Sequence, residues 1–175
     1  MQTADYQQRR SEIEKYFDRT AAEAWSRLTS DAPVSRIRRT VRAGRDLMRS
    51  VMLDWLPEDL KGKRILDAGC GAGNFAFEAA ERGAHVLGID LSPTLVQLAR
   101  DRMPDFSGNG SVEFRVGDML DAVSDGFNYL VAMDSLIHYD SSDGLNVLSK
   151  LSEKIEESMI FTFAPRTFFL GSMHT

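Results

Sequence analysis

The sequence predicts an α/β protein whose sheet is mainly parallel and is covered by helices on both faces. Two observations carry this prediction: from residue 64 onward short apolar runs alternate with helical patterns, and the first run leads into a glycine-rich turn. Strands that alternate with helices form parallel βαβ units, because each helix returns the chain to the start of the next strand. Ligands of such sheets bind at the carboxyl ends of the strands. We therefore expect a binding site at that edge.

A helical region precedes the predicted sheet. Residues 5–28 have the apolar spacing of a helix, and Pro33 marks a break before a second helix that runs to about Trp55. Pro57 ends that second helix. We therefore expect an N-terminal helical arm or lid over residues 1–57 and a core domain over residues 58–175.

The later elements follow from residues that begin or end helices. Ser92 is a favourable N-cap, Pro93 suits the first helical position, and Gly83 suits a helix end. The predicted strands are residues 64–68, 85–90, 112–117, 128–133 and 159–164, and the predicted helices are residues 74–82, 93–103 and 143–157.

The turn after the first strand is the strongest functional signal. Gly69, Gly71 and Gly73 alternate with other residues after Asp67, so the backbone can turn sharply and approach a ligand closely. The helix that follows directs free N–H groups at that ligand. A nicotinamide dinucleotide fits the glycine spacing, but the Asp67 carboxylate would repel its pyrophosphate. The same carboxylate suits the ammonium group of S-adenosylmethionine, which we expect as the cofactor.

Two further acids end the next two predicted strands. Asp90 is expected to accept hydrogen bonds from both ribose hydroxyls of a nucleoside. Asp118 is expected to accept from the adenine amino group, with Leu91 and Met119 packing on the two faces of the base.

These motifs, in this order, resemble those of the Rossmann-like S-adenosylmethionine-dependent methyltransferases over about residues 60–165. The resemblance implies a Rossmann-like, doubly wound sheet, S-adenosylhomocysteine as the product, and cofactor contacts from the fourth strand, which ends at Met133. Methyltransferases of this fold usually add a helix and two strands after strand five. Because only residues 165–175 remain here, we expect those C-terminal strands to be missing.

The N-terminal region bears on the substrate. Arg38, Arg42, Arg45 and Arg49 form an arginine stripe on the second helix, which fits either a solvated basic face or a cationic wall for a carboxylated substrate. Tyr16, Phe17 and Trp25 on the first helix fit either core packing or a cover for a flat apolar ligand.

Residues 15–20, 24–28 and 134–139 together resemble the magnesium-protoporphyrin O-methyltransferase family of (bacterio)chlorophyll biosynthesis. The resemblance implies magnesium protoporphyrin IX as the substrate, with a methyl ester formed on one propionate, and it leaves open a partner such as a magnesium chelatase subunit. His138, just beyond the fourth strand, and Tyr16 are then the expected catalytic residues. The expected substrate contacts are Phe17, Trp25, Arg38, Arg42 and Tyr139.

Composition narrows the class of protein. The chain of 175 residues is 43% apolar and 27% charged, as in ordinary globular proteins. A net charge of −5, with basic residues in excess only over residues 1–63, argues against a nucleic-acid partner. No apolar run approaches the roughly 18 residues of a membrane span, so we expect a cytoplasmic protein with at most loose peripheral membrane association. The single cysteine, Cys70, excludes an internal disulfide and disfavours a zinc site.

Three alternatives stay open from the sequence. One is a methyltransferase for another small molecule, such as a phenol, a quinone precursor or an amine, because such enzymes share the glycine loop. The second is a module that binds the cofactor without turnover. The third, an NAD-dependent oxidoreductase, is disfavoured by Asp67.

Overall fold

The computed structural model describes residues 4–21, 35–122 and 126–163. Its strands form one five-stranded sheet. They are β1 (Arg64–Ala68), β2 (His85–Asp90), β3 (Ser111–Val116), β4 (Phe127–Ala132) and β5 (Ile155–Phe161). Their order is β3-β2-β1-β4-β5, and every neighbouring pair is parallel. Because the order reverses between β1 and β4, a crevice opens above their carboxyl ends. The predicted parallel α/β fold is confirmed.

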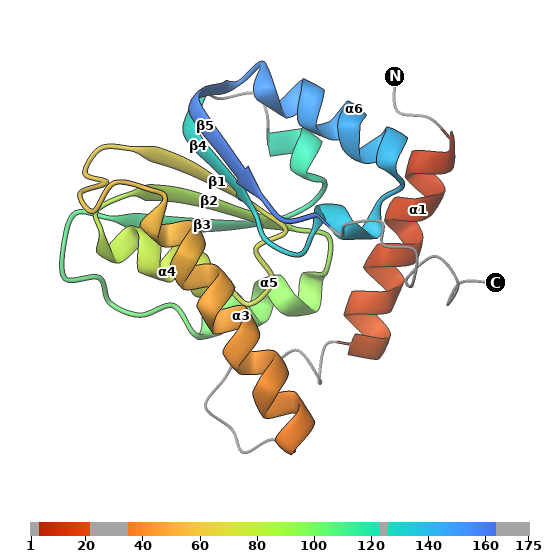
Figure 1. Cartoon of the computed structure of the whole chain (residues 1–175), viewed down its shortest axis with the longest axis horizontal. Coiled ribbons are helices and arrows are strands. Elements are labelled where there is room, and N and C mark those ends of the chain that lie inside the picture. Colours follow the sequence, from red (N-terminus) through yellow and green to blue (C-terminus); the bar gives the residue numbers. More distant parts are fainter. Residues whose placement is uncertain (1–3, 22–34, 123–125, 164–175) are drawn as a thin grey trace.

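Helices cover both faces of the sheet (Figure 1). One face carries α3 (Arg36–Asp54), α4 (Asn74–Glu81) and α5 (Pro93–Asp101), and the other carries α6 (Ser141–Ser152). Ile65 and Leu66 of β1 belong to the two different core clusters, because successive strand residues point to opposite faces. Short 3-10 helices, η2 (Met119–Ala122) and η3 (Leu136–His138), follow β3 and β4 at the carboxyl edge.

The N-terminal segment lies across that same edge. α1 (Ala4–Lys15) continues into a π-helical segment, η1 (Tyr16–Ala21), and runs beside the carboxyl ends of the strands in Figure 1. The rest of the helix predicted over residues 5–28 lies outside the described residues. α3 is different, because Met52 and Leu53 in its last turn belong to the core cluster beneath α4 and α5.

Capping contacts mark the starts of two helices, and the predicted N-cap Ser92 is confirmed. The Ser92 hydroxyl accepts a hydrogen bond from the Leu95 backbone N–H at 3.2 Å, and Pro93 occupies the first turn of α5. Ser35 caps α3 in the same way, through the Arg38 N–H at 3.4 Å. Within the described ranges, no helix is long and apolar enough to cross a membrane.

The predicted end of the chain needs a correction. The helix expected over residues 143–157 ends at Ser152, and the strand expected over residues 159–164 occupies Ile155–Phe161. The side chains of Glu156 and Glu157 accept hydrogen bonds from the Asn128 amide of β4 at 3.1 and 3.0 Å. Glutamate favours helices in isolation, but pairing with β4 overrides that local preference. The described residues contain no strand after β5.

Candidate cofactor and substrate site

A cavity of about 250 Å³ lies at the carboxyl ends of the strands. Its wall comes from the glycine turn after β1, the ends of the neighbouring strands, α3, η3 and the N-terminal segment. Most residues predicted from the sequence as cofactor or substrate contacts line it. They are Phe17, Arg42, Asp67, Gly69, Gly71, Asp90, Leu91, Met119, Met133, His138 and Tyr139.

The remaining predicted residues lie elsewhere. Tyr16 is 54% exposed and packs edge-on against Phe17, with ring centroids 5.1 Å apart, so it does not line the cavity. Arg38 is exposed on α3 and also stays outside the lining. Trp25 lies outside the described residues. The catalytic role of Tyr16 and the substrate roles of Arg38 and Trp25 stay predictions.

Gly73 and Asp118 are also absent from the lining. Gly73 has φ of +81°, and a Cβ there would lie 2.6 Å from Cζ of Phe114 and 2.9 Å from Cζ of Phe77, so this glycine is required by the core. The Asp118 carboxylate accepts hydrogen bonds from the Tyr6 hydroxyl and the Leu120 N–H, each at 2.9 Å. Its expected contact with adenine stays a prediction.

Gly71 and Asp90 hold the glycine turn open toward the cavity. Gly71 has φ of +54°, which side chains other than glycine rarely adopt, and a Cβ there would meet no atom within 4 Å. Its N–H donates to Oδ2 of Asp90 at 2.9 Å, while Oδ1 of Asp90 accepts from the Ser92 N–H at the same distance. Burial raises the pKa of Asp90, and hydrogen-bond donors lower it again. Additional donors, such as ribose hydroxyls, would therefore favour its carboxylate form.

The surroundings of the Asp67 carboxylate show which kind of cofactor fits this cavity. It is 2% exposed, and within the described residues its Oδ2 has no hydrogen-bond partner. Burial, together with the negative charge of Asp90, raises the pKa of Asp67 to about 7. A buried carboxylate in this state is stabilised by a positive charge or an N–H donor. The residues therefore fit the cationic end of S-adenosylmethionine and disfavour a pyrophosphate.

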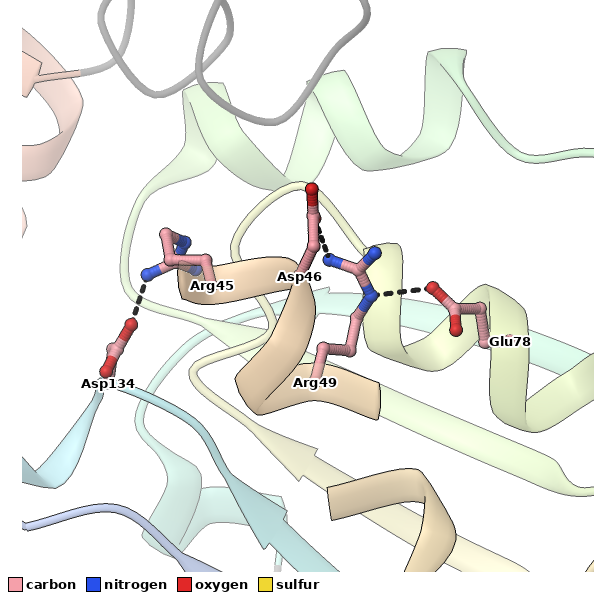
Figure 2. Close-up of polar contacts among 5 residues, drawn as sticks. All are labelled: Arg45, Asp46, Arg49, Glu78 and Asp134. Carbon is pink, nitrogen blue, oxygen red and sulfur yellow. Dashed lines mark hydrogen bonds and ion pairs between the residues drawn. The ribbon is translucent and has the colours of Figure 1, made fainter. Parts of the chain in front are cut away.

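Arginines of α3 form a second wall of the cavity. Arg42, Arg45 and Arg49 line it together, because residues three and four apart share one helix face. Figure 2 shows Arg49 held between Asp46 of α3, at 2.9 Å, and Glu78 of α4, at 2.6 Å. Arg45 and Arg49 belong to the predicted arginine stripe, although only Arg38 and Arg42 of that stripe were expected as substrate contacts.

Arg45 forms an ion pair with Asp134, which follows β4 (Figure 2). Asp134 is held in an uncommon backbone conformation, with φ of +56°, and its N–H donates to Oγ1 of Thr162 at 2.7 Å. The next residue, Ser135, donates from its hydroxyl to the Ala68 carbonyl at 2.8 Å. The turn after β4 is thus fixed to α3, β1 and the segment after β5.

His138 is positioned by that turn and by the N-terminal segment. Its ring packs edge-on against Phe17 at 5.1 Å, and its carbonyl accepts a hydrogen bond from Nε of Arg9 at 2.8 Å. Burial lowers the pKa of His138, although the nearby charge of Asp134 opposes the shift. The imidazole is therefore neutral at pH 7 and carries one N–H donor and one acceptor nitrogen.

Comparisons with known proteins agree with this geometry. A family model described as "Methyltransferase domain" matches residues 59–166. The magnesium-protoporphyrin O-methyltransferase of Rhodobacter capsulatus is 51% identical over 168 residues, which are 95% of this chain and 75% of that protein. The ubiquinone biosynthesis O-methyltransferase of Methylocella silvestris is 37% identical over 135 residues, which are 70% of this chain and 51% of that protein.

A solved structure matches the fold and the N-terminal region together. The crystal structure of magnesium protoporphyrin IX methyltransferase from Synechocystis with bound SAH superimposes with a TM-score of 0.83 at 28% identity. The match covers 93% of this chain and 75% of that chain. With the cofactor cradle described above, these relatives show that the chain belongs to the magnesium-protoporphyrin O-methyltransferase family of S-adenosylmethionine-dependent methyltransferases.

Proposed function

We propose that this protein transfers a methyl group from S-adenosylmethionine to a propionate carboxylate of magnesium protoporphyrin IX, giving the monomethyl ester and S-adenosylhomocysteine. The observation that carries the proposal is the buried carboxylate of Asp67 beside the glycine turn, whose Oδ2 has no hydrogen-bond partner in the described part of the chain, with His138 lining the same cavity. The substrate is supported by the 51% identity to the Rhodobacter capsulatus enzyme.

The cofactor supplies an electrophilic methyl group when it is bound. The chain then has to orient and desolvate the nucleophile, because a propionate with a pKa near that of glutamate, about 4.3, is already ionised at neutral pH. Asp67 and Gly71 hold the cofactor end of the site, and Asp90 fixes the turn between them. No proton transfer is needed for the substrate oxygen to react.

His138 is the proposed hydrogen-bond donor to that propionate. A neutral imidazole can donate its N–H to one carboxylate oxygen while the other oxygen faces the methyl group. Phe17 packs against the ring and excludes water from one side of it. Arg42 provides positive charge on the α3 wall of the same cavity, which would attract a substrate carrying two propionates.

The N-terminal segment over residues 4–21 is the proposed lid. It supplies Ile13 and Phe17 to the cavity wall, so a bound cofactor would lie partly beneath it. A large planar substrate needs an opening step before it can reach His138. Tyr16, half exposed on this segment, would then contact the substrate only after a further closing movement.

A methyl-transfer assay tests the proposed function. Labelled S-adenosylmethionine is supplied with magnesium protoporphyrin IX, metal-free protoporphyrin, or a panel of phenols, quinone precursors and amines. We expect label in the first porphyrin ester well above every other substrate. Label in a phenol, quinone precursor or amine alone would establish the alternative small-molecule methyltransferase. Cofactor binding without label in any product would establish a module without turnover.

We further propose that α3 contacts an anionic lipid surface, which would make this protein a cytoplasmic enzyme with peripheral membrane association. Ile37 and Leu47 of α3 are 79% and 67% exposed, and Trp55, directly after α3, is 69% exposed; the exposed Arg36 and Arg38 lie on α3. An apolar stripe flanked by arginines suits the boundary between headgroups and acyl chains.

The protein should cosediment with vesicles containing phosphatidylserine, and Trp55→Ser should reduce the bound fraction severalfold. Binding to a magnesium chelatase subunit through this face, without vesicle binding, would replace the lipid proposal.

A further inference from the structure

Tyr6, near the start of α1, is buried where β3 ends. It is 4% exposed, and its hydroxyl lies 2.9 Å from both Oδ1 and Oδ2 of Asp118. Its ring stacks on that of Tyr139 with centroids 5.4 Å apart and an interplanar angle of 16°. Burial raises the pKa of the Tyr6 hydroxyl, so this group stays a proton donor throughout the physiological range. This contact joins residues 112 positions apart in the sequence.

Asp118 links this contact to the cofactor cavity. It is 1% exposed and stands between Gly117 and Met119, which both line the cavity. Oδ1 also accepts the Leu120 N–H at 2.9 Å, so the carboxylate is fixed by a backbone donor as well as by Tyr6. A carboxylate offers about four acceptor positions, which leaves capacity for a donor on the cavity side.

The N-terminal segment meets two more strand ends beyond Asp118. Arg9 donates to the His138 carbonyl after β4, and Oδ1 of Asp18 accepts the Thr94 N–H at 3.1 Å at the start of α5, after β2. Ile13 and Phe17 line the cavity between these contacts. The segment therefore spans the pocket and is held on both sides of it.

The three contacts differ in their access to water. The Arg9–His138 and Asp18–Thr94 hydrogen bonds are exposed, and the hydrogen bond that Asp18 accepts from the Ser92 hydroxyl is partly buried, whereas the Tyr6 hydrogen bond is buried. Exposed polar contacts add little because water competes for them, but a buried bond to a carboxylate contributes more. Tyr6 is accordingly the strongest polar contact among the three.

We propose that Tyr6 is a positioning residue, whose hydrogen bond to Asp118 anchors the N-terminal segment over the cofactor and holds Phe17 against His138. The proposal rests on the cofactor assignment of the proposed function, and it is independent of the porphyrin. Loss of the hydroxyl shifts the segment toward its open form. Cofactor then leaves faster, and His138 loses its packing partner for part of the time.

Tyr6→Phe is the informative variant, because it removes the hydroxyl and keeps a ring to stack on Tyr139. Tyr129→Phe is a matched control: the Tyr129 hydroxyl on β4 donates to the Glu157 carboxylate, and Tyr129 does not line the cavity. Both variants lose one tyrosine hydroxyl bonded to a carboxylate. If the lost hydroxyl acted only by lowering the stability of the fold, both variants would show the same effect.

Two measurements on the full chain separate anchoring from general stability. Limited trypsin cleavage at Arg9, Arg10 and Lys15 of α1 reports the open population when opening is fast relative to cleavage. Stopped-flow displacement of S-adenosylhomocysteine reports the rate at which cofactor leaves. We expect Tyr6→Phe to raise both rates by about ten- to a hundredfold, the effect of losing one hydrogen bond to a buried carboxylate. Tyr129→Phe should stay within about twofold of the parent for both.

The kinetic parameters add a readout that loss of folded protein cannot imitate. Tyr6→Phe should raise KM for S-adenosylmethionine more than it lowers kcat, whereas a smaller folded fraction lowers kcat alone. Equal cleavage and equal displacement rates in Tyr6→Phe and the parent would overturn the anchor. Faster cleavage in Tyr6→Phe with no cofactor binding by the parent would retain the anchored segment and refute the cofactor assignment.

Discussion

Arg45 of α3 and Asp134 of the turn after β4 form an ion pair at the wall of the cofactor cavity (Figure 2). Their side chains are 22% and 20% exposed, so the pair is shielded from most of the solvent. The pair joins the arginine wall to the turn that leads to His138. A change at either residue therefore affects both walls.

A double-mutant cycle tests this connection. Arg45→Met and Asp134→Asn should each reduce the free energy of unfolding by about 1–3 kcal/mol, because each leaves the other partly buried group without its charge partner. The double variant should lose less than the sum, with a coupling energy of about 0.5–3 kcal/mol in denaturant unfolding. The exposed pair Arg115–Glu113 is the control, and its coupling should lie below about 1 kcal/mol. Additive losses at Arg45 and Asp134 would contradict the connection.

Cofactor affinity should depend on pH through Asp67. The pKa of this group is about 7 in the free protein, above its ordinary value of 3.8, so the carboxyl group is mostly protonated below pH 7. A bound cation favours the carboxylate, lowers this pKa and releases a proton. Affinity should therefore rise as the pH increases toward about 7 and then level off.

Calorimetry in buffers of different ionisation enthalpy measures that proton release directly at about pH 6. Asp67→Asn should abolish the release and flatten the pH dependence. In the free protein the same raised pKa makes the folded state lose stability from about pH 4, where unfolded Asp67 ionises, up to about pH 7. Proton release that is unchanged in Asp67→Asn would assign it to another group.

Asp90→Ala should weaken cofactor binding by about 1–3 kcal/mol, the cost of leaving polar partners unmatched. The variant also frees the N–H groups of Gly71 and Ser92, so part of the loss arises from a looser turn. Asp90→Asn retains an acceptor oxygen and should lose less than Asp90→Ala in an equilibrium titration with S-adenosylhomocysteine. Unchanged affinity in Asp90→Ala would refute the ribose assignment.

His138→Ala should lower turnover by roughly ten- to a thousandfold and leave cofactor affinity nearly unchanged, as expected for one lost positioning hydrogen bond. His138→Gln, which keeps an N–H donor, should recover part of the rate. An imidazolium also donates, and burial lowers the pKa of His138 from its ordinary value of 6.5, so the rate of the parent at saturating cofactor should not fall as His138 protonates. An acid limb that vanishes in His138→Gln would instead identify a general base.

Local sequence signals were sufficient for the elements around the glycine turn. β1 and β2 were predicted at their observed bounds, because Asp67, Asp90 and the glycines mark where apolar runs end. β5 was placed too late, since its pairing with β4 is a long-range contact that no local pattern reports. Glu156 and Glu157 extended the helical pattern into a strand.

The site shows the same division between local and long-range information. Asp67, Gly71 and Asp90 were identified because each lies at, or just after, the end of a strand in a fixed order. Tyr6 was missed, because it is an isolated aromatic in a polar helix, and its partner Asp118 is 112 positions away. Asp134 was recognised only as part of the 134–139 segment, and its ion pair with Arg45 was not predicted because that contact depends on how α3 packs.

Gly73 has a consequence for how this protein can evolve. The turn that carries the cofactor rests on Phe77 and Phe114, whose rings meet edge-on at 5.8 Å in the space that a Cβ at Gly73 would need. A substitution that enlarges or shifts either ring therefore moves the turn and the sheet packing together. Substitutions at Phe77 or Phe114 should therefore change cofactor affinity and melting temperature together, so selection on one property also changes the other.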